Sequence, residues 1–434
     1  MLKLKLQLLV LLLALTASSR GQGKSVLFQK RFDNYLNFNG SLSPYVLITD
    51  KDVRIYKNSN DKNNDLPELM IDYSEIKIFE YLLKYAPQDS IDAILKRKGA
   101  KKWGRKKFAE MQILYEEEPH NYTVIKPLDG KKIVIDPGHI AGNADMAFIE
   151  QKYLRFVKDS FPQLPVDSVK LQEGVLTYAT ACILKKQLEE QGANVILTRG
   201  ENKTVFGITY QEWFIHRKKT TLDSLKNTGD LDAAKHKRLF GLDPKTFFWE
   251  FFRDFELAAR ARYINKQNPD LSIIIHYNVD EKNVPWSKPS DKNYTMVFMP
   301  GAFNSETIKS INGKANFLRL LLTEDLPLSE KISALTVKEF SKTLNLPIAS
   351  KTDADYLKEN CLSPHNNGVY CRNLALCRNV KAPLVYGECL YQDNHKEYME
   401  LSKKDKSYYG IQSNTRVKAV SDAYFNAIMQ FYKK

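Results

Sequence analysis

Cysteine is scarce in this 434-residue sequence, and no apolar run after residue 15 reaches the roughly 20 residues that a membrane-spanning helix needs. The five cysteines form no Cys-x-x-Cys pair, which argues against a cysteine-rich zinc site and against a disulfide scaffold. Their odd number leaves at least one thiol unpaired, even if Cys371 and Cys377 form a bridge. With only 19 glycines and 17 prolines, collagen-like and low-complexity classes are also excluded.

The N-terminus has the layout of a secretory signal peptide. Lys3 and Lys5 precede a short apolar core at residues 8–15, and small residues follow at 16–19. We interpret residues 1–21 as a signal peptide, the alternative being a buried N-terminal helix. The mature protein is then expected to be exported and to contain no transmembrane segment.

Basic residues outnumber acidic ones, with 65 Lys and Arg against 51 Asp and Glu, for a formal net charge of +14. Such a balance favours anionic partners, namely nucleic acid, a membrane surface or a cell-wall polymer, without choosing among them. The export signal and the lack of a recognisable nucleic-acid-binding motif argue against a nucleic-acid partner.

Residues 22–128 are expected to form a small N-terminal region of mixed α and β structure. Its patterns predict a strand at 45–49, a polar loop at 58–64 and a helix at 75–84. The stretch 96–107 holds eight Lys or Arg residues, which we interpret as a solvated basic face, the alternative being contact with an anionic polymer. The region either binds the cell wall or a regulatory protein partner, or only braces the rest of the chain.

Beyond a soft boundary at Asp129-Gly130, strands and helices alternate to the end of the chain. This alternation predicts one α/β domain over residues 129–434, with a twisted, mostly parallel sheet flanked by helices. Buried strands are predicted at 133–135, 194–198, 272–275 and 383–386, and helices at 173–191, 256–268, 337–344 and within 408–432.

Polar side chains follow three of these predicted strands. His139 comes after the first strand, His276 after the third and Glu388 after the fourth, while Glu173 opens the helix that follows the first strand. In an open α/β sheet, ligands bind beyond the carboxyl ends of the strands. We therefore expect these four side chains to meet at one edge of the sheet.

Two histidines and one glutamate make a catalytic zinc set with an open position, and a second glutamate can act as a proton shuttle. Each residue also has an ordinary interpretation. A histidine at a strand end is usually a hydrogen-bonded structural residue, and a glutamate in the first turn of a helix complements the helix dipole. The joint placement of four such residues favours a hydrolytic zinc site that is complete for cleaving an amide.

The motifs that carry a family resemblance are, in chain order, Ile133 to His139 (IVIDPGH), Glu173-Gly174, Leu197-Thr198-Arg199, Arg260 with Asn265, Ser272 to Asn278 (SIIIHYN) and Pro383 to Glu388 (PLVYGE). This succession resembles the zinc-dependent N-acetylmuramoyl-L-alanine amidases of bacterial cell walls. The match runs from about residue 132 to the C-terminus, with every motif in order.

The resemblance implies that His139, Glu173 and His276 bind one Zn²⁺ ion and that Glu388 is the catalytic acid and base. The implied substrate is peptidoglycan, cut at the amide between the lactyl group of N-acetylmuramic acid and the L-alanine of the stem peptide. The implied location is the periplasm or cell envelope of a bacterium.

The sequence departs from the family pattern by three expected insertions, near residues 141–170, 200–255 and 279–330. In the first, Asp145 and Glu150 are competing metal-ligand candidates, but Glu173 is preferred because a clear helix follows it. The aromatic residues of the second either pack a helical subdomain or form a lid or glycan-binding wall. The third is a hypothetical self-inhibitory segment.

Two other function classes stay open from the sequence. The first is a non-catalytic protein that binds or regulates the cell wall on the same fold, which is expected to have lost at least one of the four site residues. The second is a zinc hydrolase of another exported amide, because the unusual loops alter access to the site.

Overall fold

The computed structural model describes residues 23–100, 103–115, 126–140, 142–162, 164, 167–283 and 288–433. The proposed signal peptide lies outside the described residues. Within the described part of the chain, no helix has the length and apolar character needed to traverse a bilayer.

A seven-stranded mixed sheet forms the centre of the molecule, in the order β10-β11-β9-β12-β8-β4-β7. Four of its six strand pairings are parallel: β7 with β4, β4 with β8, β8 with β12, and β9 with β11. The predicted mostly parallel sheet is therefore confirmed, with β9 antiparallel to β12 and β10 antiparallel to β11. The bounds are β4 Lys132–Pro137, β7 Asn194–Leu197, β8 Leu271–Asn278, β9 Met296–Pro300, β10 Cys361–Leu362, β11 Val369–Arg372 and β12 Leu384–Tyr391.

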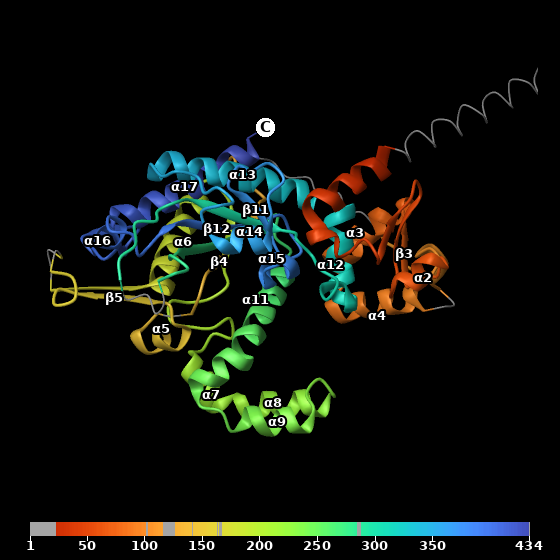
Figure 1. Ribbon diagram of the computed structural model, residues 1–434, viewed down its shortest axis with the longest axis horizontal. Coiled ribbons are helices and arrows are strands. Elements are labelled where there is room, and N and C mark those ends of the chain that lie inside the picture. Colours follow the sequence, from red (N-terminus) through yellow and green to blue (C-terminus); the bar gives the residue numbers. More distant parts are fainter. Residues whose placement is uncertain are drawn as a thin grey trace, which may run out of the picture.

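Helices cover both faces of this sheet (Figure 1). On one face lie α6 (Glu173–Glu190), α13 (Asp325–Leu344) and α17 (Thr415–Tyr432), and on the other lie α11 (Arg253–Gln267) and α15 (Ala375–Asn379). Because strand side chains alternate between faces, Ile133 and Ile135 join the first core while Val134 joins the second. Coverage on both faces explains why the central strands read as continuous apolar runs.

The N-terminal region contains an antiparallel sheet of β1 (Val46–Ile48), β2 (Asp52–Ile55) and β3 (Leu69–Asp72), with helices α3 (Ile76–Tyr85) and α4 (Gln88–Gly99). These helices pack against α12 (Ile311–Leu322), and the region shares one hydrophobic core with the large sheet. The predicted polar loop at 58–64 is wrong. It contains the short helix α2 (Ser59–Asn63), which begins because the Asn58 side chain accepts a hydrogen bond from the backbone N–H of Asp61.

The basic stretch 96–107 is only partly a solvated face, and the prediction is wrong for Lys98. This side chain is fully buried, and its Nζ lies 3.0 Å from Glu75 Oε1 and donates to the Lys106 carbonyl at 2.6 Å. It also lies 4.5 Å from the centre of the Phe108 ring. Lys96 and its exposed neighbours do face solvent, whereas residues 101–102 lie outside the described part.

The three expected insertions have distinct structures. The first holds α5 (Ala144–Glu150) and a hairpin of β5 (Tyr153–Val157) and β6 (Ser168–Gln172). The second is helical, with α7 Tyr210–His216, α8 Lys218–Asn227, α9 Ala233–Phe240, α10 Pro244–Phe247 and the π-helix η5 Phe248–Phe252. Its buried Tyr210, Trp213, Phe247, Phe248 and Phe252 pack in a core that is separate from the two cores of the sheet and that also includes Ile140, Met146 and Ala147. This packing confirms the interpretation as a packed helical subdomain.

The third expected insertion, 279–330, is not a loop insertion. It supplies β9 to the central sheet and α12 to the contact with the N-terminal region.

All five cysteines are free, so Cys371 and Cys377 form no bridge. The smaller elements are α14 Asp355–Asn360, α16 Glu397–Leu401, β13 Lys406–Tyr408, β14 Ile411–Ser413, and the single turns η1 Phe32–Leu36, η2 Phe38–Gly40, η3 Tyr73–Glu75, η4 Ala109–Met111 and η6 Thr307–Lys309.

Candidate metal centre and active site

The turn after β4 brings His139 against His276 at the end of β8. Gly138 is required in this turn, because a Cβ there would lie 2.4 Å from both Cε1 and Nε2 of the His276 ring. His139 itself has a φ of 60°, in the left-handed region that non-glycine residues rarely adopt. The resulting turn brings the two ring centroids to 4.8 Å, nearly perpendicular to each other.

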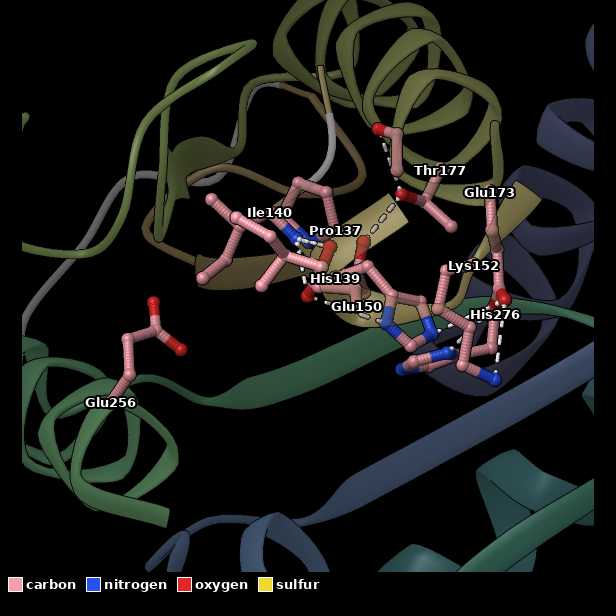
Figure 2. Close-up of polar contacts among 12 residues, drawn as sticks. Pro137, His139, Ile140, Glu150, Lys152, Glu173, Thr177, Glu256 and His276 are labelled. Atoms are coloured by element: carbon pink, nitrogen blue, oxygen red, sulfur yellow. Dashed lines mark hydrogen bonds and ion pairs between the residues drawn. The ribbon is translucent and has the colours of Figure 1, made fainter. Parts of the chain in front are cut away.

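Glu173, the first residue of α6, places its carboxylate beside both histidine rings (Figure 2). Its Oε2 lies 3.2 Å from His139 Nε2, and its Oε1 lies 3.0 Å from His276 Nδ1. One ligand atom from each of the three residues lies within 4.8 Å of the others. Glu173 Oε2 is buried and makes no hydrogen bond to any described residue, so this donor set fits a metal ion with two imidazoles and a carboxylate.

Burial lowers the pKa of His139, but the Glu173 charge outweighs it and raises that pKa, so His139 must give up a proton to bind a metal. The protonation states of the other two residues suit metal binding. Burial lowers the pKa of His276 to about 4, which keeps the imidazole neutral at neutral pH. Burial raises the pKa of Glu173, but the neighbouring His139 and Lys152 charges outweigh it and hold that pKa well below its usual range. A neutral imidazole and an ionised carboxylate are the forms that bind metal.

Two further side chains orient the histidines. Glu150 accepts hydrogen bonds from the Ile140 backbone N–H and lies 3.6 Å from His139 Nδ1, on the side of the ring away from Glu173. Tyr386 stacks on the His276 ring at 4.6 Å, with only 5° between the planes. Glu150 therefore resembles the carboxylates that orient metal-binding histidines rather than a ligand, and Asp145 is exposed in the first turn of α5.

Two buried arginines donate hydrogen bonds to backbone carbonyls of the turn that follows β4. Arg260, on α11, donates to the carbonyls of Pro137 and His139 at 3.1 Å and pairs with Glu256 and Asp136. Arg199, just after β7, donates to the carbonyls of Pro137 and Gly138 at 3.0 Å. These bonds satisfy buried carbonyls that the irregular turn leaves without partners in the sheet.

Glu388 lies inside β12 rather than after it, because the strand continues to Tyr391. It is the register partner of His276 on β8, and it points to the same face of the sheet as Tyr386, two residues earlier. Burial and, next, the charge of Glu173 raise the pKa of Glu388 to about 8. Three of the four side chains that were expected to meet lie in contact, and Glu388 is the neighbour of His276 on the adjacent strand.

Comparison with known protein families decides what kind of site this is. A family model described as N-acetylmuramoyl-L-alanine amidase matches residues 133–413. The chain belongs to this family. It is therefore an amidase that acts on the cell wall. No curated protein matches the sequence.

Solved structures of amidases are similar to this chain, at low identity. The CwlD amidase from Clostridioides difficile, solved in complex with the GerS lipoprotein, is 16% identical, with a TM-score of 0.38 over 70% of this chain and 98% of its own. The amidase Ami1 from Mycobacterium smegmatis is 14% identical, with a TM-score of 0.36 over 70% of this chain and 98% of its own.

A cavity of about 480 Å³ extends from the histidines of the amidase across the sheet face beneath α11. Its walls include Phe248, Trp249 and Arg253 of the helical subdomain and its junction with α11. The packed subdomain therefore also forms one wall of the cavity. No described residue of 279–330 lines it, which gives the self-inhibition hypothesis no support.

The structure brings three of the four residues named from the sequence into contact, but sequence reasoning missed the residues that support them. Lys152, with its Nζ 3.7 Å from Glu173 Oε2, carries no motif that would have identified it, and Tyr386 stood in the motif PLVYGE without an assigned role. Arg199 and Arg260 stood in the family motifs without an assigned role, and their buried positions could not be deduced from the sequence alone.

Proposed function

We propose that this chain is an exported, zinc-dependent amidase that cleaves the bond between N-acetylmuramic acid and the L-alanine of the peptidoglycan stem peptide. The observation that supports this proposal best is the buried trio His139, Glu173 and His276, whose ligand atoms lie within 4.8 Å of one another. Membership of the amidase family supplies the substrate class.

In the proposed reaction, His139 and His276 each present one ring nitrogen, and Glu173 one carboxylate oxygen, to a single zinc ion. Zinc, when bound, supplies Lewis-acid activation of the scissile carbonyl and of water. The Glu388 carboxylate takes a proton from the attacking water and delivers it to the departing alanine nitrogen. The carbon–nitrogen bond breaks, the lactyl carbon gains the water oxygen, and the stem peptide leaves with a free amino terminus.

Digestion of purified sacculi tests this proposal. The mature protein with zinc is expected to release stem peptides that begin at L-alanine, identified by mass, and a chelator is expected to abolish the release. Glu388→Gln is expected to remove activity while retaining zinc, and Glu359→Gln, an exposed glutamate of α14, serves as the matched control. Absence of release from several wall types would instead favour a non-catalytic wall binder, and cleavage of a different amide would favour another exported substrate.

Export and the role of the N-terminal region are part of the same proposal. A wall substrate requires passage out of the cytoplasm, which the basic and apolar layout of residues 1–21 is suited to direct. We propose that residues 22–128 brace the catalytic domain of residues 129–434, because buried Arg31 donates to the carbonyls of Leu321 and Thr323 at the end of α12. A regulatory protein partner stays a prediction.

A further inference from the structure

Arg372, the last residue of β11, lines the same cavity as His139 and His276. Its guanidinium carbon lies 4.8 Å from the ring centres of both Phe298 and Tyr356. Two aromatic faces therefore fix the position of the charged group. Leu374 and Leu376 also line this cavity, and apolar walls strengthen the electrostatic interactions that are made inside it.

Arg372 differs from the other basic residues of the cavity wall in its partners. Each of the others has a carboxylate partner, with these nitrogen-to-oxygen distances: Lys152 to Glu173, 3.7 Å; Arg253 to Asp254, 2.9 Å; Arg260 to Asp136, 3.3 Å. Within the described part of the chain, no carboxylate lies at ion-pair distance from the Arg372 guanidinium. Arg372 can therefore bind a carboxylate of a ligand without first breaking an ion pair within the protein.

The carboxylates that line the cavity already have partners. Asp136 and Glu256 pair with Arg260, and Glu150 lies 3.6 Å from His139 Nδ1. The centre of the Tyr386 ring lies 4.6 Å from the centre of the His276 ring and 5.9 Å from that of the Phe298 ring, against which Arg372 packs. An extended peptide advances roughly 3.3–3.6 Å per residue, so two or three residues cover this path.

We propose that Arg372 binds a carboxylate of the stem peptide, within the first three residues after the scissile amide, and so selects stem peptides with free carboxylates. The inference rests on the proposed function, because it places the scissile amide at the histidine end. A planar guanidinium matches a carboxylate through two parallel, charge-assisted hydrogen bonds. Amidation of the carboxylate removes both the charge and one acceptor.

Two synthetic substrates test the proposal: N-acetylmuramoyl-L-Ala-γ-D-Glu-L-Lys with free carboxylates, and the same peptide with those carboxyls as carboxamides. The native protein with zinc is expected to favour the free carboxylates by about 30-fold in kcat/KM, mostly through KM. Arg372→Gln is expected to erase this preference while still cleaving the carboxamide peptide, and Arg372→Lys to retain part of it. Arg253→Gln, whose arginine is already paired with Asp254, is the matched control and is expected to keep the preference.

Equal cleavage of both peptides by the native protein would overturn the proposal, and so would an equal loss on both peptides in Arg372→Gln. Calorimetric binding of the intact peptides to Glu388→Gln gives a second readout, in which the free carboxylates are expected to bind more tightly. If the native protein cleaves neither peptide, the proposed function fails, and the binding comparison alone decides for or against the carboxylate site. Thermal unfolding of each variant confirms that it is folded.

Discussion

Replacing Gly138 by alanine should separate the two histidines while leaving every proposed ligand in the chain. The added Cβ would lie 2.4 Å from two atoms of the His276 ring and 2.6 Å from the Ile275 carbonyl oxygen. An ordinary contact needs about 3.4 Å, so the ring or the turn must move by about 1 Å. Misplacement of a catalytic group by that amount can cost about 100-fold in rate.

We therefore expect Gly138→Ala to lower kcat/KM on muropeptides by about 100-fold and zinc affinity by about 10–100-fold. Overpacking is expected to cost about 1–3 kcal/mol of stability, which leaves the protein folded. Activity, zinc affinity by chelator competition and urea unfolding measure the three effects. Gly241→Ala is the matched control, because its Cβ would meet nothing nearer than 3.8 Å. If Gly138→Ala retained zinc affinity and turnover within threefold of the native protein, this account of the turn would be refuted.

Three further changes test other parts of the structure. Lys98→Met should reduce the free energy of unfolding by about 3–5 kcal/mol, because it leaves the buried carboxylate of Glu75 without its ion-pair partner. The control Lys96→Met, at an exposed lysine, should change it by less than about 0.5 kcal/mol. Equal effects of the two substitutions in urea unfolding would contradict the buried pair. Glu150→Gln should weaken zinc binding by about 10–100-fold by loosening the orientation of His139, and unchanged affinity would mean that Glu150 plays no such part. Arg260→Gln should lower kcat/KM and zinc affinity together, since the His139 carbonyl loses its donor and the Pro137 carbonyl keeps only Arg199. A loss of kcat alone would point to another role.

The sequence predicted the central strands well, because β4, β8 and β12 are buried on both faces and their apolar runs are unambiguous. The strands β9, β10 and β11, which form one side of the sheet, were missed. They are short, and β9 pairs with β12, which lies far from it along the chain. Such pairing is decided by tertiary packing, so local pattern alone does not reveal it. The expectation of a loop insertion at 279–330 was wrong for the same reason.

The candidate site was predicted at the level of residues but not of their surroundings. His139 follows β4, His276 and Glu388 are register partners near the ends of β8 and β12, and Glu173 opens a helix, so the topology places all four near one edge. The burial of Lys98 was not predictable, because its partner Glu75 lies 23 positions away and a run of basic residues ordinarily faces solvent. That Arg372 lines the cavity could not be predicted either, because its position depends on the pairing of β11 with β9.

Diffraction from crystals grown with zinc, recorded on both sides of the zinc absorption edge, examines the central claim most directly. A single anomalous peak is expected about 2.0–2.2 Å from one nitrogen of His139, one nitrogen of His276 and one oxygen of Glu173. An anomalous peak at some other group of side chains, or none in crystals that turn over muropeptides, would contradict it.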